Sequence, residues 1–234
     1  MGLVYEQSSR LMRSIYDWRL HDPAVLDAAD RFPTGRDFVA AWPELRDEAL
    51  HLGRDLSRIP RFHELMAAQR SISAQDRRDW RMFVLKAYGV RVAPNMAQCP
   101  RLAALVDAAP DVLSATLSFL APHKRIPPHR GPFRGVLRFY LGLVVPTAAD
   151  GRPATVLTLD GVDHRLAAGD SLLWDDTFVH AVHNDSDQPR IALLLDVRRR
   201  GMPADLELLT RLVIAGARLA LQRHPLARGR AAPR

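Results

Sequence analysis

The feature that most constrains the fold is a change in hydrophobic period near residue 113. After this point the chain consists of short segments rich in branched and aromatic residues, separated by Pro, Gly, Asp and Asn. These segments cover residues 114–120, 136–145, 155–159, 171–174, 179–182 and 191–197. No pattern between them is long enough for a helical crossover between parallel strands. The sequence therefore predicts a mainly β fold with flanking helices, a sandwich or jelly roll rather than a parallel sheet.

Helical patterns flank this β region on both sides. We expect a helix that begins near Trp42, short helical patterns over 60–85, and helices over 102–112 and 205–221, with a turn at 88–89. The first half of the chain is expected to cover one side of a sheet.

The length of 234 residues indicates a single domain that is large enough to enclose a small-ligand pocket. We expect residues 1–112 to form a helical or irregular N-terminal support and residues 113–200 to form the jelly-roll catalytic core. Residues 201–224 are expected to form a C-terminal helix, and residues 225–234 a disordered end.

The charge distribution argues against a nucleic-acid-binding protein. The net charge is +7, but residues 1–196 carry 24 basic and 24 acidic side chains, so the excess lies in the arginines of the C-terminal part. A basic tail without a reading motif is a general attractor of anions. Its helix is apolar on one side and followed by arginines, so it could also contact an anionic membrane surface; packing on the β region or on a second copy is the alternative.

The single cysteine, Cys99, excludes an internal disulfide and a cysteine-based metal cluster within one chain. No segment has the length and apolarity of a membrane span, and the N-terminal residues do not read as a secretory signal. We expect a cytoplasmic protein.

Two of the nine histidines stand in distinctive contexts. His129 follows two prolines at the edge of a predicted strand, and His180 begins the approach to the last strand pair. Imidazoles on neighbouring strands can face one metal ion, and neutral imidazole suits Fe, Zn, Cu or Ni, so the spacing leaves the metal open. His183, His123 and His164 are expected to lie outside the metal site.

Two arginines accompany these histidines. Arg138 interrupts an apolar strand nine residues after His129, and Arg190 opens another strand ten residues after His180. A buried guanidinium needs an anionic partner, and its planar fork matches a carboxylate. A dicarboxylic acid would satisfy both arginines.

In this order and spacing, the motifs resemble the aspartyl/asparaginyl β-hydroxylase family of Fe(II)- and 2-oxoglutarate-dependent dioxygenases. The resemblance rests on SFLAP at 118–122, HRGP at 129–132, VLRFYLGLVVP at 136–146, WDDTFVH at 174–180 and RIALLLDV at 190–197. Shorter likenesses to the bacterial branch at 42–46, 80–83 and 95–100 extend it back to about residue 40. The resemblance implies a double-stranded β-helix, a jelly-roll fold of the cupin type.

Matched residue by residue, the resemblance implies that His129 and His180 bind iron. It also implies that Ser118, Arg138 and Arg190 hold the carboxylates of 2-oxoglutarate.

Two positions depart from what such sites usually carry. Tyr140 stands where the family often has a histidine in the cosubstrate strand, and it can still donate one hydrogen bond. Gly131 stands where the wider superfamily has the carboxylate of a two-histidine, one-carboxylate triad. Part of the family binds iron through two histidines, with Asp176 here as a candidate to orient bound water. Asp175 competes for that role, and strand alternation places the two side chains on opposite faces.

The function implied by the resemblance is hydroxylation of a C–H bond with Fe(II), 2-oxoglutarate and O₂. The expected substrate is the β-carbon of an Asp or Asn residue in a peptide or protein. A lipid A acyl chain, or a free or carrier-bound amino acid, is the alternative within the class. A non-enzymatic cupin-like sensor and a zinc-dependent isomerase or lyase are the alternatives outside it.

Overall fold

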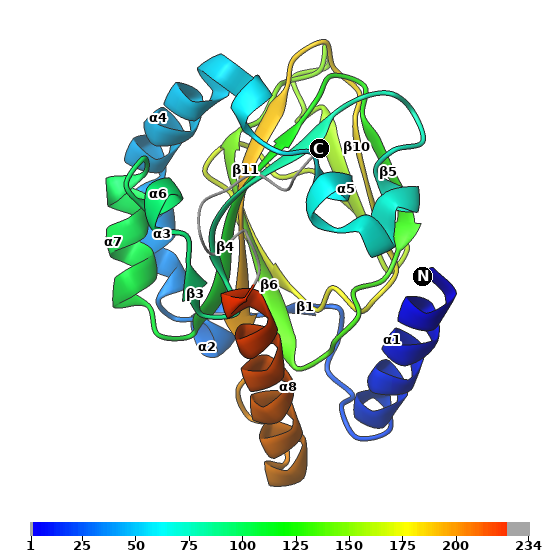
Figure 1. Cartoon of the computed structure of the whole chain (residues 1–234). Coiled ribbons are helices and arrows are strands. Elements are labelled where there is room, and N and C mark those ends of the chain that lie inside the picture. Colours follow the sequence, from blue (N-terminus) through cyan, green and yellow to red (C-terminus); the bar gives the residue numbers. More distant parts are fainter. Residues whose placement is uncertain (1, 224–234) are drawn as a thin grey trace.

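Two antiparallel sheets face each other in the computed structural model, which describes residues 2–223 (Figure 1). The seven-stranded sheet has the order β1-β9-β6-β11-β4-β2-β3 and the four-stranded sheet the order β5-β10-β7-β8. The large sheet consists of β1 (Val25–Leu26), β9 (Ser171–Trp174), β6 (Val136–Val144), β11 (Arg190–Arg198), β4 (Val112–Leu120), β2 (Trp80–Ala87) and β3 (Val90–Arg91). The small sheet consists of β5 (Arg125–His129), β10 (His180–Asn184), β7 (Thr155–Leu159) and β8 (Val162–His164).

The path of the chain between the sheets identifies the fold. From β4 to β11 the chain visits the large, small, large, small, small, large, small and large sheet in turn, so that β4, β11, β6 and β9 lie opposite β5, β10, β7 and β8. Every strand pair of the two sheets in residues 2–223 is antiparallel. This alternation is that of a double-stranded β-helix, and the predicted jelly roll is confirmed.

Helices cover the outer face of the large sheet (Figure 1). They are α2 (Ala28–Arg31), α3 (Gly35–Ala40), α4 (Trp42–Leu52), α6 (Ala93–Met96) and α7 (Pro100–Ala108). The main core lies in this layer, where Phe38, Leu45 and Leu102 pack with Phe119 and Phe139 of the sheet. Because the helices cover the outer face of the large sheet, a ligand-binding site can form only on its inner face, which faces the small sheet. The short helices η1 (Gly53–Arg58), α5 (Phe62–Leu65) and η2 (Ala67–Ile72) follow α4.

Three local predictions are corrected by the structure. The helix expected over 102–112 is α7, which ends at Ala108 because Pro110 restricts the residue before it; Val112 already belongs to β4. The N-terminal region expected to be helical or irregular also contributes β1, β2 and β3 to the large sheet. β5 was not predicted because it contains two prolines, which its position at the edge of the small sheet accommodates.

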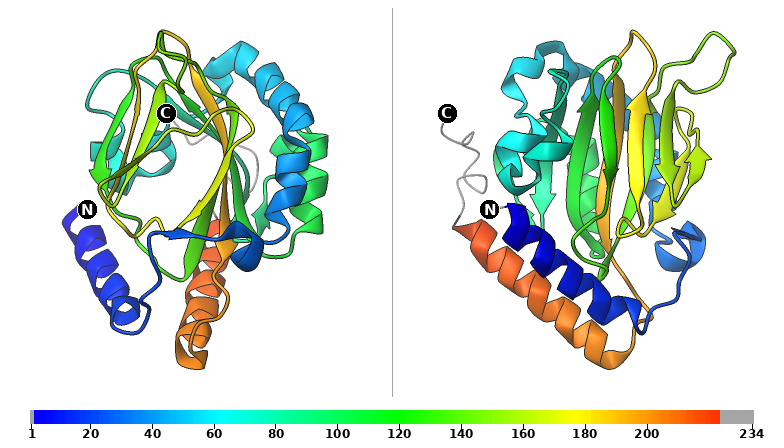
Figure 2. Two further views of the ribbon diagram at one scale, coloured as in Figure 1. Left: turned by 180° about the vertical axis from the view of Figure 1, so that it is seen from behind. Right: turned by 90° about the vertical axis from the view of Figure 1, so that its right-hand side faces the viewer.

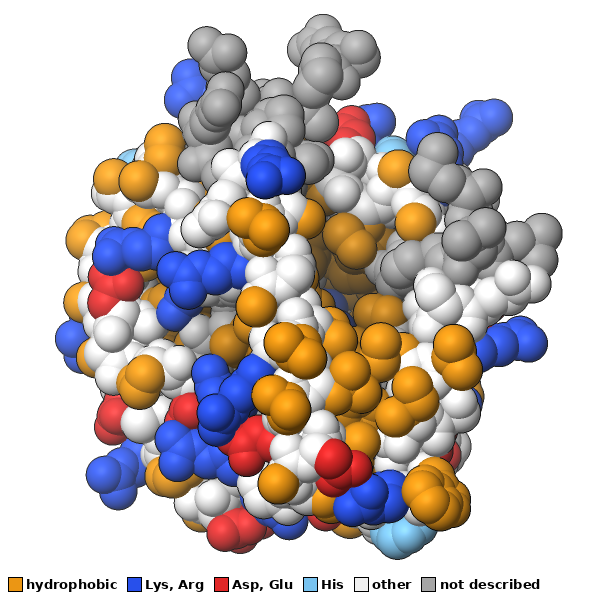
Figure 3. Space-filling model, turned by 60° about the horizontal axis from the view of Figure 1, so that its bottom comes forward, with side chains coloured by type: hydrophobic (Ala, Val, Ile, Leu, Met, Phe, Trp, Pro, Cys, Tyr) orange, Lys and Arg blue, Asp and Glu red, His pale blue; other side chains and the backbone are white. Residues whose placement is uncertain are grey.

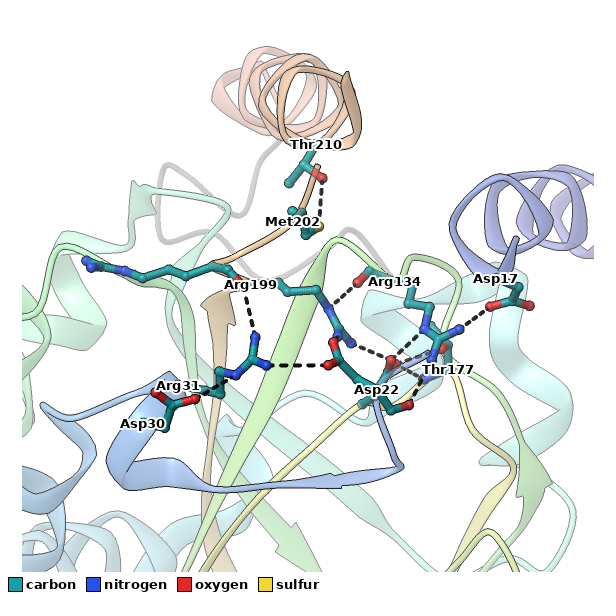
Figure 4. Close-up of polar contacts among 11 residues, drawn as sticks. Asp17, Asp22, Asp30, Arg31, Arg134, Thr177, Arg199, Met202 and Thr210 are labelled. Carbon is teal, nitrogen blue, oxygen red and sulfur yellow. Dashed lines mark hydrogen bonds and ion pairs between the residues drawn. The ribbon is translucent and has the colours of Figure 1, made fainter. Parts of the chain in front are cut away.

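A buried ion cluster joins distant parts of the chain beneath the barrel (Figure 4). The fully buried Arg199 pairs with Asp175 and, at 2.7 Å, with Asp22. Arg134 pairs with Asp175 at 2.8 Å and with Asp17 at 2.7 Å. The cluster therefore ties the end of β9 to the segments that follow α1 and β11.

The two terminal helices, α1 (Gly2–Asp17) and α8 (Ala204–Gln222), lie on the outside of the barrel (Figure 2), where the hydroxyls of Tyr16 and Thr210 join them. α8 confirms the helix expected over 205–221, and the end predicted to be disordered, 225–234, lies outside the described residues. Among residues 2–223, no helix combines the length and apolarity needed to cross a membrane.

Candidate active site

His129 and His180 face each other across two paired strands. His129 ends β5, His180 begins β10, and the two residues are register partners in the small sheet. Their ring centroids are 4.1 Å apart. The structure thus brings together two histidines that are fifty-one positions apart in the sequence.

Both imidazoles are oriented by the backbone. Nδ1 of His129 is 2.9 Å from the carbonyl oxygen of Pro127, and Nδ1 of His180 is 2.9 Å from that of Phe178. A carbonyl oxygen only accepts hydrogen bonds, so both Nδ1 atoms carry the proton and both Nε2 atoms keep a lone pair. This is how metal-binding histidines are commonly fixed.

Burial keeps this pair uncharged. It lowers the pKa of His180 to about 3, with the neighbouring His129 as the next cause, and it also lowers the pKa of His129. Neutral, oriented imidazoles fit a divalent transition metal such as Fe(II). Within residues 2–223 no cluster of three His, Cys, Asp or Glu side chains is arranged to hold a metal, so the donor set offered is two histidines.

A cavity of about 60 Å³, the inner pocket, extends from this pair between the sheets. Its walls include Ser118, Tyr140, Thr155, Trp174 and Arg190. Burial lowers the pKa of Arg190, and within residues 2–223 no carboxylate forms an ion pair with it. Its Nη1 lies 3.3 Å from the hydroxyl of Ser118, and its guanidinium lies over the Tyr140 ring. The inner pocket thus holds a buried cation that lacks an anion.

Three buried side-chain polar atoms of the described chain have no hydrogen-bond partner, and all three belong to walls of the inner pocket. They are Nε of Arg190, Nε1 of Trp174 and Oγ1 of Thr155. Buried polar groups are rarely left unpaired, because each carries a desolvation cost. Two of these atoms are donors and the third is a hydroxyl, so they match a small molecule with several acceptor oxygens.

Arg138 differs from Arg190 because the chain itself supplies its anions. Its Nη2 lies 2.8 Å from Oδ1 of Asp196 and its Nη1 lies 3.1 Å from Oδ2 of Asp176. Burial opposes its charge, but these two carboxylates raise the pKa of Arg138 above its ordinary value. The charge of Arg138 therefore does not require an external acid, and its contact with a cosubstrate stays a prediction.

Asp176 is held against Gly131. A Cβ added at Gly131 would lie 2.2 Å from Oδ1 of Asp176, and the amide nitrogen of Gly131 donates to the carbonyl oxygen of Asp176 at 2.7 Å. Burial raises the pKa of Asp176 to about 6, although Arg138 acts in the opposite direction. Asp175 points the other way, into the buried ion cluster, as strand alternation predicted.

A second and larger cavity, the outer groove, meets the inner pocket at the two histidines. It has a volume of about 440 Å³, and Trp80, His129, Arg138, His180 and Leu194 line both spaces. Its apolar walls include Leu65, Met66, Ile72, Met82, Val84 and Leu221. The histidine pair therefore stands between a small pocket that holds an unpaired buried arginine and a larger groove, and both are lined mainly by apolar side chains.

The remaining histidines lie as expected in two cases. His183 pairs with Asp185 and His123 with Asp187, and neither belongs to the pair of His129 and His180. His164 was expected outside the site, but it lines the inner pocket from β8, opposite Leu157 of β7.

Sequence reasoning also missed Thr155, Trp174 and Asp196 as parts of the site. An acidic residue in the apolar run at 190–197 was a usable signal, because it lies on the strand next to that of Arg138. Trp174 stands at the start of the motif at 174–180 but was not assigned to the site, and nothing in the sequence marked Thr155.

Comparison with known proteins gives a consistent result. Residues 39–200 match the family model described as aspartyl/asparaginyl beta-hydroxylase. An ornithine lipid ester-linked acyl 2-hydroxylase from Rhizobium tropici is 31% identical over 197 residues, which are 80% of this chain and 68% of that protein. The human aspartate beta-hydroxylase domain-containing protein 2 is 30% identical over 128 residues, 51% of this chain and 33% of that protein.

Among solved structures, a predicted oxalate decarboxylase from Thermotoga maritima aligns with a TM-score of 0.34 and 16% identity. The alignment covers 54% of this chain and 89% of that chain.

Proposed function

Because the chain belongs to the aspartyl/asparaginyl β-hydroxylase family, we propose that it is an Fe(II)- and 2-oxoglutarate-dependent hydroxylase that acts on a lipid acyl chain. One observation carries the proposal: the oriented histidine pair stands between an inner pocket with an unpaired buried arginine and an apolar outer groove. A dicarboxylic cosubstrate suits the pocket, and a hydrocarbon chain suits the groove.

His129 and His180 would hold the iron through their Nε2 atoms. Bound iron, with 2-oxoglutarate and O₂, supplies oxidation of an unactivated C–H bond: one oxygen atom enters the substrate, and the cosubstrate leaves as succinate and CO₂. The chain's part is to orient the reactants and exclude water.

Arg190 would bind one carboxylate of 2-oxoglutarate, with the hydroxyl of Ser118 beside it. Thr155 and Trp174 offer further polar atoms to the same molecule. Tyr140 lies under the guanidinium of Arg190 and would support its position rather than supply charge, since burial raises the pKa of its hydroxyl. Arg138 would hold Asp176 in place near the histidines, where the carboxyl could orient a bound water.

The choice of an acyl chain as substrate rests on the outer groove and on the Rhizobium relative, whose name gives acyl 2-hydroxylation of a lipid. Arg138, which lines the groove at the histidines, is already paired with two carboxylates and is not free to bind an aspartyl carboxylate. The β-carbon of an Asp or Asn residue remains the second candidate, because the family takes its name from that reaction. The cytoplasmic location expected from the sequence belongs to the same proposal.

The test presents iron-loaded protein with 2-oxoglutarate, O₂ and, separately, an ornithine lipid, lipid A, and Asp- and Asn-containing peptides. Mass spectrometry should find one added oxygen on an acyl chain. The variant Val84→Trp, which fills the outer groove, should lose lipid oxidation but keep substrate-independent succinate formation.

If only the peptides were oxidised, the substrate would be an Asp or Asn residue instead of a lipid. If the protein bound 2-oxoglutarate but formed no succinate under any condition, it would be a sensor. If a variant that lacks Arg190 were active with zinc, the protein would be an isomerase or lyase.

A further inference from the structure

The terminal helices α1 and α8 lie on the outside of the barrel and contact each other through side chains. The hydroxyls of Tyr16 and Thr210 lie 2.9 Å apart, and Arg19, just after α1, pairs with Asp205 at the start of α8. The buried sides of the helices pack in a small core that includes Tyr16, Leu206 and Phe133. Each helix therefore already uses one apolar side to hold the fold.

Each helix carries a second apolar stripe that faces away from the protein. On α1 and the residue after it, Leu11, Ile15 and Trp18 follow the spacing of one helical face. On α8 the stripe is Leu208, Leu212 and Leu219. We call these six residues the terminal-helix face.

The exposure of this face is large. Trp18 is 80% exposed, Leu11 66% and Leu212 63%. Six of the eleven exposed large hydrophobic side chains identified among the described residues belong to it, and Figure 3 shows hydrophobic side chains gathered over both helices. Contiguous exposed apolar patches mark interaction sites.

The charge around the face is positive. On the surface of these helices Arg10, Arg19 and Arg211 pair with Glu6, Asp205 and Glu207. The excess positive charge therefore comes from Arg218 and Arg223. Arg218 and Arg223 have no ion-pair partner within the described part of the chain, and Figure 3 shows basic side chains beside the apolar ones. An apolar face with an exposed tryptophan and flanking arginines complements an anionic lipid surface.

A second copy of the chain suits this face less well. A two-fold contact would place the same patch on both partners and would bring the unpaired arginines Arg218 and Arg223 of both copies to one interface. A bilayer with anionic headgroups offers both hydrocarbon and the opposite charge.

The position of the face also matches the openings of the site. Leu221, in the last turn of α8, lines the outer groove, and Glu6 of α1 lines a surface hollow that reaches His129. A bilayer seated on the helices would therefore lie beside the route to the histidine pair. This consequence rests on the proposed function, whereas docking itself does not.

We propose that the terminal-helix face docks the protein, without spanning, on the surface of an anionic phospholipid bilayer. Leu11, Ile15, Leu208, Leu212 and Leu219 enter the boundary between headgroups and acyl chains. Trp18 enters at the same depth, and the arginines contact the lipid phosphates.

The experiment mixes the full chain, without metal or 2-oxoglutarate, with vesicles of phosphatidylcholine alone and of equal parts phosphatidylcholine and phosphatidylglycerol. Flotation should recover the protein with the anionic vesicles only, and added salt should weaken the binding. Emission from Trp18 should shift to shorter wavelength on binding, and this shift should be absent from Trp18→Phe.

Leu212→Glu should weaken vesicle binding by about tenfold or more, as expected for loss of one buried leucine. The matched control Leu50→Glu alters a half-exposed leucine on α4 and should bind like the wild type. Equal binding by both variants would overturn the proposal, because attraction through the three arginines of residues 224–234 alone would produce that result.

Absence of vesicle binding, with a concentration-dependent dimer that Leu212→Glu dissociates, would assign the face to a second copy instead. Because no turnover is measured, failure of the hydroxylase proposal would leave these results unchanged.

Discussion

The carboxyl of Asp176 occupies the space that any side chain at Gly131 would need: an added Cβ would lie 2.2 Å from its Oδ1. Gly131 is two residues after His129, the position of the carboxylate in a two-histidine, one-carboxylate iron site. Here a carboxyl lies near that place but comes from the other side of the site, held by Arg138. A glycine is thus required by the packing of Asp176.

Gly131→Asp should therefore damage the site instead of completing an iron triad. The new side chain must displace Asp176, an overpacking that costs about 1–3 kcal/mol of stability. We expect a lower melting temperature, no gain in iron affinity and reduced succinate formation. The control Gly216→Ala, at an open position of α8, should be neutral or stabilising. A stable Gly131→Asp protein with tighter iron binding would refute this explanation of the glycine.

His180→Ala should abolish iron binding, because the pair would lose one of its two oriented Nε2 donors. His183→Ala, on the same strand, should keep the iron content of the wild type, since His183 pairs with Asp185 instead. Metal analysis after anaerobic loading and desalting measures both. If His180→Ala kept the iron content of the wild type, His180 would not be an iron ligand.

Arg190→Met should separate stability from cosubstrate binding. A buried cation without an anion is costly, so the free energy of unfolding without 2-oxoglutarate should be unchanged or higher by about 1–4 kcal/mol. The dissociation constant for 2-oxoglutarate should rise about 10- to 100-fold through loss of a charged hydrogen bond. Denaturant titration with and without 2-oxoglutarate tests both statements. Arg36→Met, at a highly exposed arginine, is the control. If 2-oxoglutarate stabilised Arg190→Met as strongly as it stabilises the wild type, Arg190 would not be the residue that binds the cosubstrate.

Asp175→Asn should destabilise the whole fold. Asp175 is fully buried between Arg134 and Arg199, and removing its charge leaves both guanidinium groups short of an anion. Breaking such a buried pair typically costs about 3–5 kcal/mol. The midpoint of urea unfolding measures this loss, with the exposed Asp30→Asn as a control that should change it little. If Asp175→Asn and the wild type unfolded at the same urea concentration, the buried ion cluster would not contribute to the stability of the fold.

The sequence predicted the strands in which apolar and branched residues predominate, because a buried strand is recognisable from that composition alone. β4, β7, β9 and β11 are of this kind. It failed for β5, whose prolines oppose a strand except at an edge, and an edge position is a property of the assembled sheet.

The same limit explains what was missed in the site. The arginines stood out because a buried guanidinium needs an anionic partner, and the resemblance to the family then assigned roles to them and to the two histidines. Which partner each one has depends on strand register: Asp196 is directly opposite Arg138, so Arg138 is neutralised internally and Arg190 is not. Thr155 and Trp174 are ordinary strand residues in the sequence. Only the folded structure shows that both line the inner pocket and that each has a polar atom without a partner.

The most direct test of the account is succinate formation from 2-oxoglutarate by anaerobically iron-loaded protein after O₂ is admitted, with wild type and His180→Ala side by side. The account predicts succinate from the wild type, stimulated by a lipid substrate, and none above background from the variant. Equal succinate from both proteins, or no binding of 2-oxoglutarate by the iron-loaded wild type, would contradict it.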